Sequence, residues 1–428
     1  MGNDHRYLHA PPHYCGALVL ALYLALDSTP CTADGTDQSR TATAPEMLSQ
    51  PLQGGSGDTM DPFTPVDRQY TLMREELARY TALTQGDVWQ PLDGGQTLAP
   101  GMRHPRVRRL RSLLMQYGDL TLRDHTDTNL ADLYDPRLQR AVRRFQRRHG
   151  LQEDALVDER TRRLLNVNPQ QRVRTLAANL SRWDMMPRDL GPRYIVVNIP
   201  DFSLRLIHNE REQLRMRVVV GKPVHATPQL TTRLTRLVFN PIWRVPPSIA
   251  VRELLPKGAA RLTASGYRLV NHKGRSVPFT AHNIAATRRG KVTLQQKGGP
   301  GNALGRVKFV IPNPEAIFLH DTNSKHLFKQ SQRAFSHGCI RLEKPLQFAR
   351  LMLTEQNSWS PERAEHYINS NRTRAVELKK PLPVYIAYWS AWVDEEGLLQ
   401  FRPDIYGRDQ TDPTDASADN GSQSDQRG

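Results

Sequence analysis

One cysteine of this sequence lies among residue types that suit acyl-transfer chemistry. The segment AFSHGCIRL holds His337, Cys339 and Arg341, and a second histidine, His320, ends the apolar run AIFLH upstream of it. A free cysteine is only a few per cent thiolate at neutral pH, so a nucleophilic cysteine needs a base or a cation beside it. Cys339 is therefore a candidate nucleophile, and His320 and His337 are candidates for its base.

The alternation of residue types around Cys339 predicts a β-strand with one reactive face. One face holds His337, Cys339 and Arg341, and the other holds Gly338, Ile340 and Leu342. A structural cysteine normally shares its face with apolar neighbours rather than with an imidazole and a guanidinium. The run AIFLH predicts a second strand, and the polar loop that follows is long enough for His320 to lie beside Cys339.

Two other uses of Cys339 remain open at this point. A zinc ion could be bound by His320, His337 and Cys339, but these residues form no Cys-x-x-Cys or His-x-x-x-His pair and have no fourth ligand nearby in the sequence. A free thiol in a core strand would explain the same spacing without any chemistry. We therefore predict no metal site, and the free thiol stays as the alternative to a nucleophile.

The apolar segment Cys15 to Leu26 has the proportions of a signal peptide. It is shorter than the roughly 20 residues that span a bilayer, and small residues after it fit a cleavage site near Asp34. The sequence thus predicts a signal peptide over 1–33. A lipoprotein modified at Cys31 and a buried core helix are the alternatives.

Cleavage near Asp34 would remove Cys15 and Cys31 and leave Cys339 as the single thiol of the mature chain. An intramolecular disulfide would then be impossible. An unpaired cysteine in an exported protein is typical of a reactive thiol or an intermolecular bridge. Export therefore strengthens the interpretation of Cys339 as a reactive residue.

Composition limits the class of protein. The chain has 428 residues, of which 24% are charged and 38% hydrophobic, and its formal net charge is +16. These values favour a soluble multidomain protein over an integral membrane bundle. Outside the cytoplasm the available polyanions are envelope polymers and phospholipid headgroups, and the positive charge is spread along the chain. We predict no nucleic-acid binding and no stable membrane insertion after signal cleavage.

Composition and periodicity also divide the chain into parts. Segments rich in Ser, Thr, Gly and Pro predict a flexible linker over 34–65 and a disordered tail over 409–428. Helical periodicity predicts three short helices within 100–168. The flanking segments 66–99 and 169–191 are expected to form a helical scaffold.

The period changes to that of β-strands from residue 192 onward. The runs FSLRLIH and EQLRMRVVV flank a turn at Asn209–Arg211, which predicts an antiparallel hairpin. A helix beginning at Pro345 is expected to cover the strand of Cys339. The fold class predicted is α+β, with a mostly β domain over 192–390, its C-terminal extension over 391–408, and a separate small three-helix domain.

The three-helix region resembles the peptidoglycan-binding domain family. The motif that carries the resemblance is AVRRFQRRHGLQEDALVDERTRRLLN, within the domain predicted over 100–168. The family usually has Asp-Gly-x-Val-Gly in its turn, whereas this chain has Ala155 and Asp158 in place of the two glycines. The resemblance implies binding to peptidoglycan glycan, and a structural spacer that binds nothing is the alternative.

The segment HDTNSKHLFKQSQRAFSHGCIRL is similar to the signature of the L,D-transpeptidase catalytic domain, in which a histidine precedes Ser/Thr-His-Gly-Cys and an Arg or Asn. The stretches VFNPIWRVPPSIAVRELLPK and GPGNALGRVKFVIPNPEAIFLHDT resemble the long Gram-negative subgroup. The resemblance covers roughly 66–408 and implies an L,D-transpeptidase domain over 192–390. Phe318 and Asn323 differ from the tyrosine and proline often found at their positions.

The resemblance implies a role for each residue of the signature. Cys339 would be the nucleophile, His320 its base, and the backbone carbonyl of Asp321 the group that orients the imidazole. His337 and the backbone amides of Gly338 and Cys339 would face the developing oxyanion. The residues expected to contact substrate are Arg341, Ser336 and Phe318, and Arg341 could bind a carboxylate through two hydrogen bonds.

The reaction implied is a two-step acyl transfer without a cofactor. Cys339 would attack the amide between diaminopimelate and D-alanine in a stem tetrapeptide, release D-alanine and form a thioester, which an amine of a second stem would resolve. The partners implied are peptidoglycan stem peptides as donor and acceptor, in the periplasm. Residues 246–301 would cap the site and exclude water, and carbapenems would acylate Cys339.

Two other functions fit the sequence. A cysteine peptidase could trim stem peptides with the same nucleophile, and a catalytically silent protein could bind the cell wall through the helical domain. The three hypotheses differ in the product formed from a tetrapeptide: cross-linked dimers, shortened monomers or no product.

Overall fold

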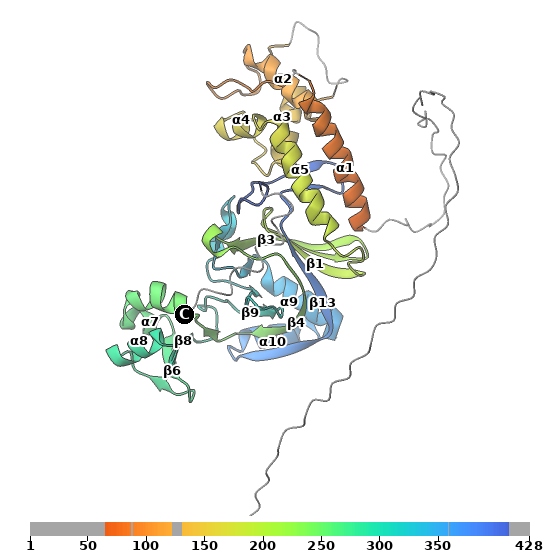
Figure 1. Ribbon diagram of the computed structural model, residues 1–428. Helices are drawn as coiled ribbons and strands as arrows, with labels where there is room; N and C mark the ends of the chain where they lie inside the picture. Colours follow the sequence, from red (N-terminus) through yellow and green to blue (C-terminus); the bar gives the residue numbers. More distant parts are fainter. Residues whose placement is uncertain (1–64, 87–88, 122–130, 358, 411–428) are drawn as a thin grey trace, which may run out of the picture. The chain divides into compact units, whose positions relative to one another are not determined.

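The computed structural model describes residues 65–86, 89–121, 131–357 and 359–410 (Figure 1). The predicted signal peptide over 1–33 lies outside the described residues, as do residues 34–64 of the predicted linker and residues 411–428 of the predicted tail. Within the described ranges no helix is both long and apolar enough to cross a membrane.

A large sheet forms the centre of the domain that contains Cys339. Its strand order is β11-β3-β12-β10-β9-β4-β13-β1-β2, and β3 also pairs with β2, so the sheet closes on itself. The strands are β1 (Arg193–Asn198), β2 (Ser203–His208), β3 (Arg211–Gly221), β4 (Leu230–Phe239), β9 (Val307–Val310), β10 (Leu319–His320), β11 (Ala334–Ser336), β12 (Ile340–Leu342) and β13 (Arg374–Ala387).

The predicted hairpin is present as β2 and β3. Its turn consists of Asn209 and Glu210, both with positive φ (47° and 62°), while Arg211 already belongs to β3. A two-residue turn with positive φ at both positions matches the right-handed twist of the flanking strands. The hairpin therefore fixes the register of β3, the strand that contacts both β11 and β12.

Apolar side chains from this sheet form one hydrophobic core. The cluster includes Leu237, Phe309, Leu319, Ile340 and Leu342, each 0% exposed. Helix α9 (Pro345–Asn357) packs on it, with the rings of Phe348 and Phe309 4.8 Å apart. The predicted helix after Pro345 is thus confirmed, and α10 (Pro361–Asn369), which follows it, also contributes to the core.

The segment predicted as an insertion over 246–301, together with residues 243–245 before it, has a second, smaller core. A four-stranded sheet in the order β5-β8-β6-β7 combines β5 (Trp243–Arg244), β6 (Tyr267–Asn271), β7 (Ser276–Val277) and β8 (Val292–Gln296). The accompanying helical elements are α6 (Pro247–Ile249), η4 (Ala250–Leu254), η5 (Leu255–Lys257), α7 (Ala259–Ala264) and α8 (Ala281–Arg288). Their apolar residues form a cluster of their own, which gives this segment its own packing (Figure 1).

Within the described residues before the large sheet there are five helices: α1 (Pro65–Thr84), α2 (Arg106–Gln116), α3 (Pro136–Arg148), α4 (Glu159–Leu165) and α5 (Pro169–Asp184). The three helices predicted within 100–168 are therefore present. Asp135, Asp158 and Asn168 cap α3, α4 and α5 through their side chains, which satisfies backbone N–H groups that have no partner inside a helix. Segment 89–99, by contrast, has no helix.

One residue of the turn in which Ala155 and Asp158 replace the glycines usual in the family has a left-handed backbone conformation. Ala155 has φ 62° and is 0% exposed. Its N–H donates to Oε1 of Gln146 at 2.8 Å, and its carbonyl accepts from the Tyr134 hydroxyl at 2.7 Å. Asp158, at the second glycine position, has become the helix cap. Hydrogen bonds therefore hold an alanine in a conformation that costs roughly 1–2 kcal/mol.

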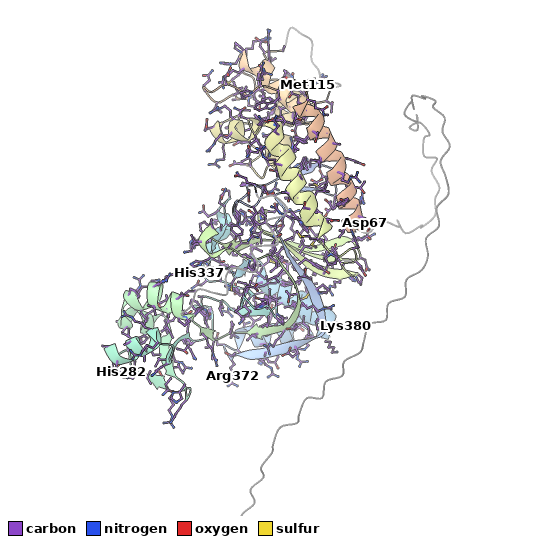
Figure 2. The ribbon with its side chains drawn as sticks, viewed as in Figure 1. Asp67, Met115, His282, His337, Arg372 and Lys380 are labelled. Atoms are coloured by element: carbon purple, nitrogen blue, oxygen red, sulfur yellow. The ribbon has the colours of Figure 1, made fainter. Side chains whose placement is uncertain are left out.

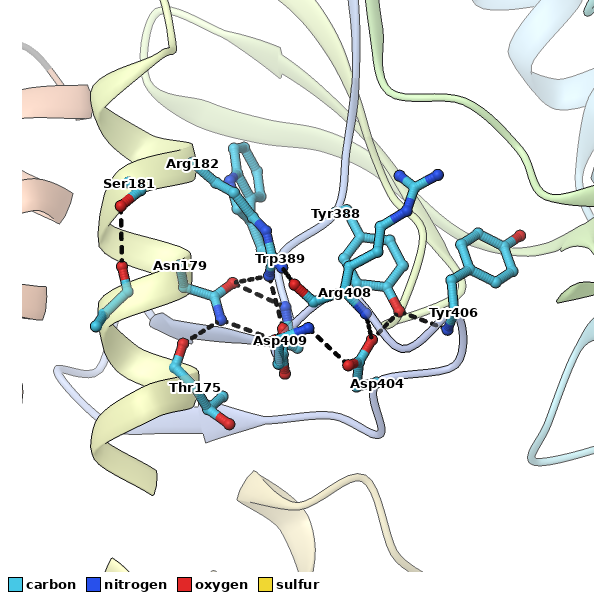
Figure 3. Close-up of polar contacts among 12 residues, drawn as sticks. Thr175, Asn179, Ser181, Arg182, Tyr388, Trp389, Asp404, Tyr406, Arg408 and Asp409 are labelled. Atoms are coloured by element: carbon cyan, nitrogen blue, oxygen red, sulfur yellow. Dashed lines mark hydrogen bonds and ion pairs between the residues drawn. The ribbon is translucent and has the colours of Figure 1, made fainter. Parts of the chain in front are cut away.

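The C-terminal segment links the helices with the large sheet. Strands β14 (Ala391–Val393) and β15 (Leu399–Phe401) pack in the hydrophobic cluster of α1–α5. Beyond them, Asp409 accepts from Nη1 of Arg182 on α5 at 2.8 Å (Figure 3). The carboxylate of Asp409 is 9% exposed, so Asp409, which the sequence prediction assigns to the disordered tail, is instead held by a buried ion pair.

Candidate active site

Three titratable side chains form a row across neighbouring strands. In the register of the sheet, His320 on β10 lies opposite Lys308 on β9 and opposite Arg341 on β12. Residues opposite each other in a sheet point to the same face. Leu319 and Ile340 pair in the same way and lie in the core. The row therefore occupies the face away from the core, as predicted for Arg341.

The chain reverses direction immediately before Cys339. Strand β11 runs parallel to β3, whereas β12 runs antiparallel to the same strand. Between them Gly338 has φ 105°, a conformation that favours glycine, and an added Cβ would lie 2.9 Å from Cδ1 of Ile317. The prediction of one continuous strand from 336 to 343 is therefore wrong, because a tight crossing over the end of β3 interrupts it. The alternation holds from Cys339 to Leu342.

A pair of hydroxyl groups holds this crossing in place. Thr227 donates from Oγ1 to the carbonyl of Gly338 at 2.7 Å and accepts from the N–H of Gly221 at 2.9 Å. The Tyr406 hydroxyl donates to the carbonyl of Gly221 at 2.6 Å and accepts from the N–H of Thr227 at 3.1 Å. Together these bonds tie the residue before Cys339 to the end of β3.

The hydrogen bonds that begin at Thr227 and Tyr406 continue into the C-terminal segment (Figure 3). The N–H of Tyr406 donates to the Tyr388 hydroxyl at 2.8 Å, and that hydroxyl donates to Asp404 at 2.5 Å. Asp404 in turn accepts from the N–H of Asp409 at 2.7 Å. Since Asp409 is paired with Arg182, hydrogen bonds connect helix α5 with the turn that carries Cys339.

The geometry of His320 suits a general base. The ring is 5% exposed, and Nδ1 lies 2.5 Å from the backbone carbonyl of Asp321, the contact that the family resemblance implies. A carbonyl only accepts, so Nδ1 carries the proton and Nε2 keeps its lone pair. Burial, with the positive charges of Arg341 and Lys308, lowers the pKa of His320 to about 4. The imidazole is therefore neutral near pH 7.

The Asp321 side chain fixes the loop that orients this histidine. Its carboxylate accepts from the N–H of Arg306 at 2.8 Å and of Thr322 at 2.7 Å, and pairs with Lys325 at 2.5 Å. It occupies space left by Gly305, whose φ is 60° and whose added Cβ would lie 2.3 Å from the carboxyl carbon. The backbone carbonyl that holds His320 is thus positioned from several sides.

Cys339 is a half-buried free cysteine. Burial raises the pKa of its thiol, although the Phe318 backbone and the charges of Lys308 and Arg341 act in the opposite direction. A raised thiol pKa beside a neutral imidazole means that the resting pair is uncharged. A nucleophilic attack by this sulfur would therefore need a general base to take the thiol proton, rather than starting from a preformed ion pair.

The two backbone amides expected to face the oxyanion, those of Gly338 and Cys339, differ in whether they already have an acceptor. The N–H of Gly338 donates to Oγ of Ser336 at 3.2 Å, so it is engaged within the turn. The N–H of Cys339 has no acceptor in the part of the chain that the structure describes. Of the two backbone amides, only that of Cys339 is therefore available to a substrate oxygen in this conformation.

Ser336 does not occupy the substrate-contacting position that the family resemblance implies. The residue is 2% exposed, and its hydroxyl donates to the carbonyl of Cys339 at 2.5 Å. The expectation that Ser336 contacts substrate is corrected, because its side chain closes the crossing from within. A small hydroxyl at this position explains how the backbone reverses in so few residues.

His337 connects the turn with the insertion. Its Nε2 lies 2.6 Å from Oε1 of Glu253 on η4, and its ring is 4.9 Å from that of His225. Figure 2 shows His337 beside the insertion and His282 of α8 farther out within it. Glu253 therefore brings the insertion into contact with His337, two residues before Cys339.

Four residues of this site were not predicted from the sequence: Thr227, Glu253, Lys308 and Tyr406. Lys308 lies with Nζ 3.3 Å from the centre of the Phe318 ring, so the phenylalanine supports a cation next to His320. A lysine in the alternating run VKFV could have drawn attention to this position. The other three depend on contacts between distant parts of the chain.

The described residues contain no group of three or more His, Cys, Asp or Glu side chains that could hold a metal ion. In these ranges Cys339 also forms no disulfide.

Comparisons with known proteins identify two regions. Residues 192–377 match the family model of the L,D-transpeptidase catalytic domain, and residues 103–165 match the model described as "Putative peptidoglycan binding domain". A curated relative from Haemophilus influenzae, named "Putative L,D-transpeptidase", is 33% identical over 219 residues. That match covers 50% of this chain and 44% of the relative, so the chain spans less than half of the relative's length.

Solved structures with lower similarity include two bacterial L,D-transpeptidases. That from Mycobacterium smegmatis is 15% identical, with a TM-score of 0.22, and the match covers 46% of this chain and 58% of the other. That from Xylanimonas cellulosilytica is 14% identical, with a TM-score of 0.22, and the match covers 69% of this chain and 100% of the other.

The two family matches agree with the observed architecture, a helical region followed by a mostly β domain. Residues 192–377 are therefore similar to L,D-transpeptidase catalytic domains, and residues 103–165 are similar to domains of the peptidoglycan-binding family.

Proposed function

We propose that this protein cross-links peptidoglycan by joining two third-position diaminopimelate residues. His320 Nε2 takes the thiol proton of Cys339 while the sulfur attacks the carbonyl between diaminopimelate and the terminal D-alanine of a stem tetrapeptide. The C–S bond forms, the C–N bond breaks, and D-alanine leaves as an amine that takes the proton from the imidazolium. The product of this step is a thioester on Cys339.

An amine of a second stem then attacks the thioester carbonyl. His320 takes the proton of the attacking amine, the C–S bond breaks, and the proton returns to the sulfur as the new amide forms. The N–H of Cys339 donates to the oxyanion in both steps, where such a preorganised donor contributes a few kcal/mol. His337, whose Nε2 contacts Glu253, is proposed to lie beside the same oxyanion.

The observation that carries this proposal is the position of His320. Its proton is fixed on Nδ1 by the carbonyl of Asp321, and its free Nε2 belongs to the face that also holds Cys339 and Arg341. Arg341, whose Nε is buried without a hydrogen-bond partner, can bind a carboxylate of the donor. The peptidoglycan-binding domain is proposed to hold glycan strands, and the site of action to be the periplasm after removal of 1–33.

The experiment that tests the proposal is incubation of purified protein with a tetrapeptide muropeptide, followed by separation and mass spectrometry of the products. Dimers linked between third-position residues, with release of D-alanine, are expected. Shortened monomers without dimers would instead indicate a peptidase. A Cys339→Ala variant serves as the control and should give neither product; equal results for both proteins would indicate a wall-binding protein without activity.

A further inference from the structure

Two cations close to Cys339 lie on opposite sides of His320. Lys308 is the cross-strand neighbour of His320 on β9, and Arg341 is its neighbour on β12. Adjacent strands are about 4.8 Å apart, so the two cations start about 10 Å from each other. They therefore offer two separate points of contact around the reacting thiol rather than one shared point.

Neither cation is neutralised by the protein. Within the described ranges no carboxylate pairs with the side chain of Lys308 or Arg341, and Nε of Arg341 is buried without a partner. Other cations in the neighbourhood are paired, Lys325 with Asp321 and Arg217 with Glu343. Lys308 and Arg341 thus differ from these two neighbours in having no carboxylate partner in the described ranges.

The surroundings of Lys308 favour an incoming anion. The side chain is half-buried, and its ammonium group lies over the face of the Phe318 ring. Arg236, on the neighbouring strand β4, is also cationic, but it is paired with Glu377 at 3.2 Å. Burial lowers the pKa of Lys308, as expected for a cation without a carboxylate beside it. A ligand carboxylate would remove this cost.

We infer that Lys308 is a specificity-determining residue that binds a carboxylate of the acyl donor, while Arg341 binds a second one. This inference rests on the proposed function. A stem tetrapeptide has a carboxylate on its terminal D-alanine and another on the diaminopimelate side chain. These are the two carboxylates nearest the scissile amide. The site therefore selects donors in which these groups are free acids rather than amides.

Binding measurements on a Cys339→Ala background test the inference without requiring turnover. Isothermal titration calorimetry compares three synthetic tetrapeptides: the free acid, the D-alanine carboxamide and the diaminopimelate carboxamide. Lys308→Met should weaken binding of the free acid by about 10-fold or more. It should leave unchanged the affinity for the one peptide that lacks the carboxylate held by Lys308, which identifies that carboxylate. Lys308→Arg should retain most of the affinity.

Lys291→Met, at an exposed lysine of the insertion, is the matched control and should bind all three peptides as the parent does. Equal weakening of all three peptides by Lys308→Met, or no weakening, would overturn the inference. So would a parent protein that binds the acid and both amides equally, a result that needs no variant of Lys308. Selective binding without any acyl-enzyme in the wild-type protein would support the carboxylate site and contradict only the proposed function.

Discussion

The hydroxyl of Thr227 donates a hydrogen bond of 2.7 Å to the carbonyl of Gly338, the residue immediately before Cys339. The same peptide unit contains the N–H of Cys339, which is the backbone donor available for an oxyanion. Fixing one end of a planar peptide unit fixes the direction of the other. In the proposed mechanism Thr227 is therefore a positioning residue, although its side chain belongs to a loop far from Cys339 in the sequence.

We predict that Thr227→Val lowers the acylation rate constant of Cys339 by about 10- to 100-fold, because one misplaced oxyanion donor costs a few kcal/mol. The dissociation constant of the donor should change little. Stopped-flow acylation at varied donor concentration separates the two quantities. Thr227→Ser should restore most of the rate, and Thr231→Val, at an exposed position of β4, should not alter it. A variant that loses affinity but keeps its rate would contradict the role.

The rate of acylation of Cys339 should begin to fall only at an unusually acidic pH. Burial and two neighbouring cations lower the pKa of His320 to about 4, so the imidazole stays neutral and able to accept a proton down to that region. The acylation rate should be nearly constant from about pH 7 to pH 5.5 and fall only below about pH 5. Lys308→Met removes one of the charges and should move this fall in rate to higher pH. A fall in the wild-type rate centred on about pH 6.5, the value of an ordinary histidine, would refute this account of His320.

Gly305→Ala should disturb His320 without touching it. The new Cβ would lie 2.3 Å from the carboxyl carbon of Asp321, and φ at this position is 60°. Displacing Asp321 moves the carbonyl that holds His320 Nδ1, so we expect activity to fall at least 10-fold. Gly301→Ala is the matched control, since nothing lies within 4 Å of its added Cβ. Full activity in Gly305→Ala would show that the loop tolerates a shift.

Ala155→Gly should stabilise the helical domain. Glycine adopts a φ of 62° without the strain that alanine carries, which is worth roughly 1 kcal/mol and about 2–4 °C in Tm. Ala177→Gly, within helix α5, should have the opposite effect because glycine weakens a helix interior. Differential scanning calorimetry of the two variants tests the difference in sign. A decrease in Tm for both would mean that the hydrogen bonds of Gln146 and Tyr134 remove the strain.

The sequence predicts those parts of the site that depend on local pattern. Alternation gives the faces of Cys339, Ile340, Arg341 and Leu342, and the proline after them marks the start of α9. The crossing at 336–338 is not predictable from alternation, because the same residue types fit a straight strand. Its signal is Gly338, whose role depends on contact with Ile317 in a different segment.

Contacts between distant segments account for what the sequence does not reveal. Lys308 reaches His320 only through the register of β9 and β10, and Tyr406 reaches Gly221 only after the C-terminal segment has passed the helical domain. The long strand β13, between β1 and β4, contains the run KKPLP and shifts register there. Such a run has none of the usual features of a central strand.

The most direct test of the proposed mechanism is the mass of the intact protein after brief exposure to a tetrapeptide stem. We predict an adduct equal to the stem minus D-alanine, located on Cys339 by peptide mapping and absent from Cys339→Ala. His320→Gln should form it at least 100-fold more slowly, since the thiol then lacks its base. An unmodified wild-type protein that nevertheless consumes the stem, or an adduct on another residue, would contradict the assignment of Cys339 as the nucleophile.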